Sequence, residues 1–351
     1  MMERLKQADR RRDGIDAHAY CDVDTRHTTW QCKPEDFSPL LPFSERIDMS
    51  NSSLTAGTLA TLTGLGREVR PQQWYKQGVL LLGITFSHNL LDPGAWTAVL
   101  FAIVAFTAVA GATYVINDIS DVEADRQHPE KRHRPIASGQ VPIPVAAAFG
   151  AALLITGFAL AFAVGPLLLA VLAVYLGQNL LYSAYVKHVV FADVISVAVG
   201  FFLRAIAGVV AIDVFLSPWL IVCTFLLALV LALVKRRHEL GASADPQRTR
   251  ETLGSYTADS VDQLLTVVTA TLLMAYALYT FTGADTAMML TLPFAFFGVF
   301  RYHHLVHTTE IAGRPEYLLT DRPLMVNLAL WAMTAVAVLY GVPGLLVGGL
   351  S

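Results

Sequence analysis

Long apolar runs separated by short polar stretches dominate this sequence from about residue 77 to its end. A helix needs about 20 predominantly apolar residues to cross the hydrocarbon core of a bilayer. Nine runs approach or reach that length, and most are bounded by proline, glycine or charged residues. The sequence therefore predicts an all-α membrane protein with nine transmembrane helices. The predicted spans are Gln77–Leu91, Ala95–Asn117, Pro142–Gly165, Pro166–Val186, Val189–Ile212, Pro218–Val234, Ala258–Thr282, Ala287–Leu305 and Leu324–Gly348.

The composition excludes several other classes of protein. Hydrophobic residues make up 54% of the 351 positions and charged residues only 15%, which is more apolar than a soluble core requires. The net charge is −3, so a nucleic-acid partner is not expected. The three cysteines match neither a disulfide framework nor a CxxC metal site.

The chain divides into two regions of different composition. Residues 1–66 have no sustained apolar periodicity, and we expect a disordered cytoplasmic tail and linker. Residues 67–351 are expected to form the transmembrane domain. The loops after the second and sixth spans are rich in arginine and lysine, and such loops usually face the cytoplasm. We therefore expect a multi-pass protein of the cell membrane, with its polar cavity open to the cytoplasm.

The most specific motif lies at the polar end of the second predicted span. Asn117, Asp121 and Asp125 are spaced i, i+4, i+8, and Asp118 precedes Asp121 by three residues. On one continuous helix, these four side chains share a face. Clustered carboxylates suit Mg²⁺, which often binds through a few of them while substrate phosphates and water complete its coordination. The motif predicts a site for Mg²⁺, or Mn²⁺ in its place, together with a diphosphate; a capped, solvated helix end is the alternative.

A cluster of three cations, all within four consecutive positions, follows the acidic motif. Lys131, Arg132 and Arg134 could neutralise the phosphate oxygens that a metal ion leaves uncovered. Determination of membrane topology is the other interpretation of such a cluster. The neighbouring acidic motif favours substrate binding.

A second group of polar residues comes from the middle of the chain. Tyr182 and Lys187 end the fourth predicted span, and Asp193 and Arg204 lie in the fifth. Charge inside a span is costly and usually faces a polar cavity, although an ion pair between helices would also account for it. Lys235 and Arg236 end the sixth span and are further phosphate candidates, again with topology as the alternative.

The residues Asn117, Asp118, Asp121 and Asp125 resemble the NDxxDxxxD signature of the UbiA superfamily of membrane prenyltransferases. The resemblance covers about residue 66 to the C-terminus and implies a helical bundle with a polar active-site cavity. The second acidic motif of the superfamily, DxxxD, is reduced here to the single Asp193.

That departure, together with the stretch from Arg70 to Lys76, resembles the branch that makes decaprenylphosphoryl-5-phosphoribose. The resemblance implies transfer of 5-phosphoribosyl from 5-phosphoribosyl diphosphate to a polyprenyl phosphate, as in the synthesis of cell-wall arabinan precursors. The acidic residues would be catalytic and would hold the metal. The implied substrate-binding residues are Lys76, Lys131, Arg132, Arg134, Tyr182, Lys187, Asp193, Arg204, Lys235 and Arg236.

Two other functions remain open from the sequence. One is prenyl transfer from a polyprenyl diphosphate to an aromatic or other small acceptor, which a complete second DxxxD motif would favour. The other is a transporter, since polar residues within spans also line transport pathways, but the sequence shows no matching second half. The sequence does not decide whether the protein forms a homo-oligomer.

Overall fold

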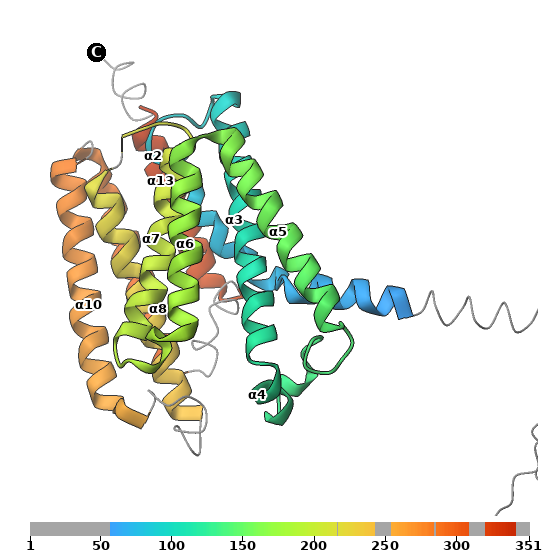
Figure 1. Ribbon diagram of the computed structural model, residues 1–351. Helices are drawn as coiled ribbons and strands as arrows, with labels where there is room; N and C mark the ends of the chain where they lie inside the picture. The colour runs from blue at the N-terminus through green and yellow to red at the C-terminus, as the bar shows by residue number, and fades with distance from the viewer. Residues whose placement is uncertain (1–56, 216, 243–253, 284–285, 309–319, 342–351) are drawn as a thin grey trace, which may run out of the picture. The chain divides into compact units, whose positions relative to one another are not determined.

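The computed structural model describes residues 57–215, 217–242, 254–283, 286–308 and 320–341. The chain forms two compact units, Met1–Ala60 and Thr61–Ser351, and most of the predicted tail lies outside the described residues. Residues 57–68 are helical, with Leu59, Leu62 and Leu65 at three-residue spacing, so a helix begins before the expected boundary at residue 66. All regular structure in the described part of Thr61–Ser351 is helical (Figure 1).

Seven helices of this unit are long and apolar enough to cross a membrane. They correspond to the second to seventh and the ninth of the predicted spans. Figure 1 shows most of them running side by side. The long helices are α3 (Pro93–Ser120), α5 (Ile143–Val164), α6 (Pro166–Ala184), α7 (Ala192–Val210), α8 (Pro218–Ala242), α10 (Ala258–Leu278) and α13 (Arg322–Leu339).

Shorter elements connect the long helices. The α-helical ones are α2 (Leu81–Phe86), α4 (Val122–Gln127) and α11 (Leu292–Thr308). The 3₁₀ segments are η2 (Pro71–Leu80), η3 (Lys131–His133), η4 (Val186–His188) and η7 (Thr286–Thr291), and η6 (Tyr279–Gly283) is a π-helical turn.

The first and eighth predicted spans are not long continuous helices in the described residues. The stretch Gln77–Leu91 divides into the end of η2, the six-residue α2 and a turn in which His88 has a φ of 62°. The stretch Ala287–Leu305 is divided between η7 and α11, because Pro293 in the first turn of α11 favours the start of a new helix. The last helix of the described residues stops at Leu339, before Gly341 in the left-handed region with a φ of 75°, and the predicted end of the ninth span at Gly348 lies outside those residues. A count of nine spans therefore remains a prediction.

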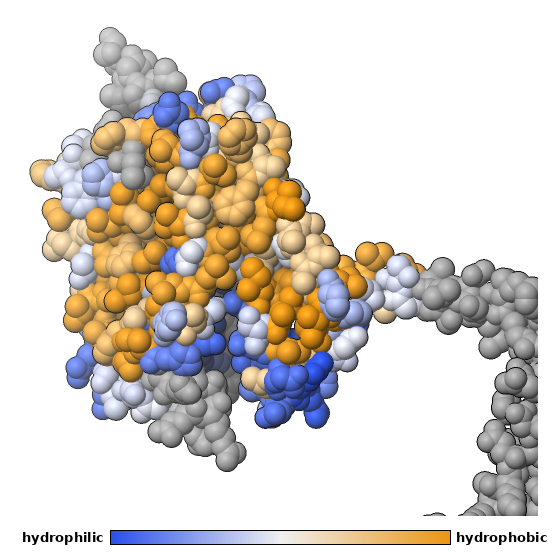
Figure 2. All heavy atoms as spheres, in the orientation of Figure 1, coloured by the Kyte–Doolittle hydropathy of each residue, from blue (hydrophilic) through white to orange (hydrophobic). Residues whose placement is uncertain are grey.

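The helices α3 and α7 form the inner part of the bundle. In the most apolar 18-residue stretch of each helix, 61% of the residues are buried in α3 and in α7, against 22% in α5 and 17% in α6. Most of the face that Figure 2 shows is apolar, and hydrophilic residues gather there at the end where α4 lies. This distribution is that of a multi-pass membrane protein with one strongly polar end.

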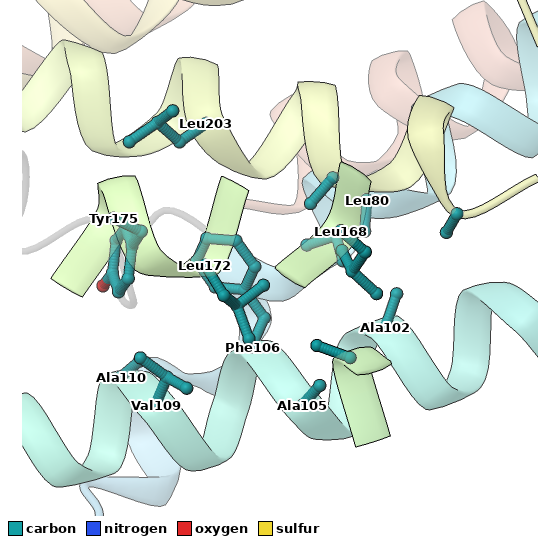
Figure 3. Packing of buried hydrophobic residues seen from close by; sticks show 13 residues of the cluster. Leu80, Ala102, Ala105, Phe106, Val109, Ala110, Leu168, Leu172, Tyr175 and Leu203 are labelled. Atoms are coloured by element: carbon teal, nitrogen blue, oxygen red, sulfur yellow. The ribbon is translucent and has the colours of Figure 1, made fainter. Parts of the chain in front are cut away.

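The main core lies where η2, α3, α6 and α7 meet. Phe106 of α3 is fully buried, and its ring centroid lies 4.5 Å from that of Tyr175 of α6 (Figure 3). Leu80, Leu168 and Leu172 close the cluster around them.

Two glycines allow α7 to touch the end of η2 and α2 through their backbones. A Cβ atom added at Gly208 would lie 2.0 Å from the carbonyl oxygen of Leu80, and one added at Gly83 would lie 2.6 Å from that of Gly208. Replacing Gly208 by alanine is therefore expected to destabilise the fold by about 1–3 kcal/mol, as overpacking does. Thermal unfolding of the purified protein in detergent measures this change.

Gly177 of α6 is the matched control, because nothing lies within 4 Å of a Cβ atom added there. Alanine at this position is expected to leave the unfolding temperature unchanged or raise it, since alanine favours a helix over glycine by about 1 kcal/mol. Equal unfolding temperatures for the Gly208→Ala and Gly177→Ala proteins would contradict the close approach of α2 to α7.

Candidate active site at the end of α3

The acidic motif spans a break between two helices rather than one continuous helix. Helix α3 ends at Ser120, Asp121 has a φ of −94° and a ψ of 8°, and α4 begins at Val122. As a result, Asp118 and Asp125 are buried, with 3% and 2% exposure, whereas the Asp121 side chain is 47% exposed. The expectation that all four side chains share one helical face thus holds only in part, because the turn at Asp121 redirects that side chain.

Two arginines meet the buried carboxylates. Arg134 donates through Nη1 to Oδ1 of Asp118 at 2.9 Å and to Oδ2 of Asp125 at 2.7 Å. Arg70 donates through Nη2 to both oxygens of Asp118, at 2.8 and 2.9 Å. The Nζ atom of Lys131 lies 3.9 Å from Oδ1 of Asp125. The site therefore holds two buried carboxylates among three cations.

Glu68 is a third buried carboxyl group, next to Asp118, and only 2% of its surface is exposed. Its Oε1 atom accepts a hydrogen bond from the backbone N–H of Ile136 at 3.1 Å, which ties the loop carrying Arg134 to residues 61–68. Burial, followed by the hydrogen bond and the negative charge of Asp118, raises the pKa of Glu68 to about 7. Glu68 therefore adds less negative charge to the site than a solvated glutamate would.

The end of α6 and the segment η4 meet the same acidic motif. Ser183 donates to Oδ1 of Asn117 at 2.6 Å, and Nζ of Lys187 lies 3.6 Å from Oδ1 of Asp121. The structure thus brings together two stretches that lie more than 60 residues apart in the sequence. Lys187 is in reach of a ligand held by the acidic motif.

Asp193 and Arg236 form a separate buried cluster between α7 and α8. Asp193 is fully buried; its Oδ2 accepts from Nε of Arg236 at 2.8 Å, and its Oδ1 accepts from the hydroxyl of Tyr256 at 2.8 Å. Arg236 also pairs with Glu239 and interacts electrostatically with Tyr182. Asp193 therefore forms an ion pair between helices with Arg236, which leaves it in place to orient that guanidinium.

The remaining predicted residues are spread over the polar end and the core. Lys76 donates to Oε1 of Gln73 at 2.9 Å, and Lys235 lies 4.0 Å from Glu239. Arg132 contacts the ring of His133 and none of the acidic motif among the described residues. Arg204 is buried in the middle of α7, where it bonds neutral groups.

Sequence reasoning did not assign Arg70, Glu68 or Tyr256 to the site. The only signal for Arg70 was its place in the stretch Arg70–Lys76 that resembles one branch of a family. No sequence pattern indicated Glu68 or Tyr256, since their partners, Asp118 and Asp193, lie 50 and 63 positions away in the sequence.

The donor set around Asp118 fits a divalent cation. Asp118 and Asp125 already direct one oxygen each at a single positive centre, Nη1 of Arg134. Carboxylate oxygens are the ligands that Mg²⁺ prefers. No group of three or more His, Cys, Asp or Glu side chains converges among the described residues, so oxygens from a substrate or water would have to complete the coordination.

Comparison with known proteins assigns the chain to a family. The chain belongs to the UbiA prenyltransferase family, whose model matches residues 79–318. It is 33% identical over 308 residues to the decaprenyl-phosphate phosphoribosyltransferase of Mycolicibacterium smegmatis, a match covering 82% of this chain and 96% of the relative. The enzyme of that name from Corynebacterium glutamicum is 33% identical over 293 residues, covering 80% of this chain and 88% of the relative.

Solved structures of the family share the fold. A UbiA homolog from Archaeoglobus fulgidus bound to GPP and Mg²⁺ has a TM-score of 0.61 at 18% identity and covers 79% of this chain and 99% of its own. The same homolog has also been solved bound to DMAPP and Mg²⁺, with a TM-score of 0.62 at 17% identity, covering 79% of this chain and 99% of its own. The chain is therefore an all-helical, membrane-integral member of a transferase family, as the acidic motif indicated.

Proposed function

We propose that this protein transfers 5-phosphoribosyl from 5-phosphoribosyl diphosphate to a polyprenyl phosphate and releases diphosphate. The observation that carries the proposal is the convergence of Asp118 and Asp125 with Arg70 and Arg134 at the polar end of α3. Carboxylates for a metal ion and arginines for phosphate oxygens are the two elements that a departing diphosphate requires. The similarity to phosphoribosyltransferases over four fifths of the chain supports this donor.

The proposed reaction exchanges one carbon–oxygen bond for another. The bond between C1 of the ribose and the diphosphate breaks, and an oxygen of the lipid phosphate bonds to C1, with inversion expected at that carbon. The lipid phosphate is already anionic at neutral pH, so it needs no strong general base. The protein contributes orientation of the two substrates and stabilisation of the charge that develops on the diphosphate.

The residues of the site have separate roles in this proposal. Mg²⁺, held by Asn117, Asp118, Asp121 and Asp125, would supply charge neutralisation at the diphosphate. Arg70 and Arg134 turn from these carboxylates to the diphosphate oxygens. The other proposed substrate-binding residues lie around this centre and along the core; they are Lys76, Lys131, Arg132, Tyr182, Lys187, Asp193, Arg204, Lys235 and Arg236.

The polar end is proposed to face the cytoplasm. Lys131, Arg132, Arg134 and Lys187 all belong to the segments near the acidic motif, and basic loops are retained on the cytoplasmic side. A water-soluble sugar diphosphate reaches the site from that side, and the lipid acceptor reaches it from the bilayer. We place the protein in the cell membrane on this basis.

Purified protein in lipid with Mg²⁺ tests the function. One mixture holds radiolabelled 5-phosphoribosyl diphosphate and polyprenyl phosphate, and the other holds polyprenyl diphosphate and 4-hydroxybenzoate. We expect labelled lipid from the first mixture only, and loss of that product with EDTA because the acidic motif needs its cation. Product from the second mixture alone would replace the proposal with prenyl transfer to a small acceptor.

A further inference from the structure

Arg204 places a positive charge deep inside the bundle. It lies eleven residues along α7 from Asp193, which corresponds to about 16 Å of helix at 1.5 Å per residue. The residue is 5% exposed. Its guanidinium donates from Nε to Oε1 of Gln77 at 3.1 Å, from Nη1 to the carbonyl oxygen of Gly200 at 2.8 Å, and from Nη2 to the hydroxyl of Tyr175 at 2.9 Å.

All three acceptors of Arg204 are neutral, and no carboxylate lies within ion-pair distance of it in the described part of the chain. Other arginines of the bundle differ in this respect: Arg236 pairs with Asp193, Arg237 with Asp262, and Arg70 with Asp118. A buried cation without a counter-charge is strongly disfavoured. Charged side chains inside membrane spans usually face the interior of the bundle and mark functional sites.

The guanidinium of Arg204 retains N–H donors that an anion could use. Its Nη1 and Nη2 atoms each carry a second N–H that bonds no acceptor among the described residues. Gly200 lies directly beside the guanidinium, since a Cβ atom added there would lie 3.4 Å from Nη1. The rings of Phe106, Tyr175 and Phe201 lie 5.0–5.5 Å from the guanidinium carbon; they stabilise a cation without neutralising it.

Tyr114 connects this region with the end of α3. The guanidinium carbon of Arg70 lies 4.6 Å from the centre of the Tyr114 ring, and Phe106, in the same helix α3, has its ring centre 5.2 Å from the guanidinium carbon of Arg204. Asp118, Tyr114 and Phe106 follow one another along α3 at intervals of four and eight residues, so they fall within an arc of about 120° around the helix. Arg204 is therefore displaced from the acidic motif along α3, on the side that carries Asp118.

We infer that the guanidinium of Arg204 binds a phosphate monoester group of a substrate, at a subsite distinct from the one that binds the diphosphate. A phosphate monoester carries the negative charge that the cluster lacks, and two of its oxygens can accept the two remaining N–H groups. This inference rests on the proposed function, which supplies two such groups. They are the 5-phosphate of the sugar donor and the phosphate of the lipid acceptor.

Direct binding measurements on the full-length protein in detergent test the inference without turnover. The probes are ribose 5-phosphate, farnesyl phosphate, and inorganic diphosphate with Mg²⁺, and calorimetry gives each Kd. We expect Arg204→Gln to weaken one of the two monoesters about tenfold or more, because a charged two-point contact is lost, and to leave the Kd of diphosphate unchanged. The monoester that is weakened identifies the source of the phosphate.

Two further variants make the outcome decisive. Arg237→Gln is the matched control, because Arg237 has Asp262 as its partner, and both monoesters should bind it as they bind the wild type. Arg204→Lys keeps the charge and loses the two-point contact, so its affinity should lie between those of the wild type and Arg204→Gln. If Arg204→Gln does not fold, the lysine variant alone should still weaken one monoester severalfold.

Unchanged affinity of both monoesters for the folded Arg204 variants would overturn the inference, and so would failure of the wild-type protein to bind either of them. The proposed function fails in a different way. If a monoester depends on Arg204 but no label passes from 5-phosphoribosyl diphosphate to a lipid, the subsite stands and the reaction is wrong.

Discussion

Replacement of Asp118 by asparagine is expected to lower kcat by about 10³-fold, the upper range for loss of one preorganised electrostatic contact to a transition state. Asp118 is the carboxylate on which Arg70 and Arg134 converge, and it is a proposed metal ligand. Asparagine keeps its size and one oxygen, so the fold should persist while the charge is lost. The rate is measured at saturating Mg²⁺ on purified protein in lipid, with thermal unfolding as a check on the fold.

Glu123→Gln serves as the control for the Asp118 variant. Glu123 lies in the same acidic stretch, but its side chain is 77% exposed and pairs only with Arg126 in the described structure. We expect turnover close to that of the wild type. Binding of Mn²⁺, counted by electron paramagnetic resonance, should fall in the Asp118 variant and not in the control. If the Asp118 variant retained turnover within tenfold of the wild type, Asp118 would not belong to the site.

Replacement of Asp193 by alanine is expected to have the largest effect on stability. Asp193 is fully buried, and its removal leaves Arg236 with Glu239 as its described partner and leaves the Tyr256 hydroxyl without its acceptor. Breaking a buried ion pair from one side typically costs about 3–5 kcal/mol. The unfolding temperature in detergent should fall accordingly.

A double variant separates the ion pair from the packing around it. Asp193→Leu combined with Arg236→Met removes both charges and fills the space with apolar side chains, which restores much of the stability that one-sided removal costs. Its unfolding temperature should lie above that of Asp193→Ala. An Asp193→Ala protein that unfolds within about 2 °C of the wild type would contradict the buried pair.

Hydropathy predicted the seven long helices because the length of an apolar run and its flanking residues are local properties. It did not predict the short elements at the first and eighth spans. The segment around Gly83 remains a short helix beside α7 because its backbone touches Gly208, a contact between residues far apart in the sequence. Local patterns carry no information about such a contact.

The same distinction applies to the site. Asn117, Asp118, Asp121 and Asp125 could be proposed together as one site because one motif contains them all. The turn at Asp121 and the approach of Arg70 to Asp118, across 48 positions, depend on how the loops fold back onto α3. For Asp193, the sequence left open whether its side chain faces a polar cavity or forms an ion pair between helices. Its contacts with Arg236 and Tyr256 depend on how the helices pack, which no local pattern predicts.

The burial of α3 and α7 inside the bundle has a consequence for which substitutions the chain can tolerate. Their buried positions are mostly alanine, glycine and valine, where a larger side chain meets a neighbouring helix. The outer surface of α5 instead carries large exposed side chains such as Ile155 and Phe162, which can exchange with other apolar residues at little cost. In random mutagenesis, the buried positions of α3 and α7 would therefore tolerate only side chains of similar volume. The outer surface of α5 would tolerate apolar side chains of any size.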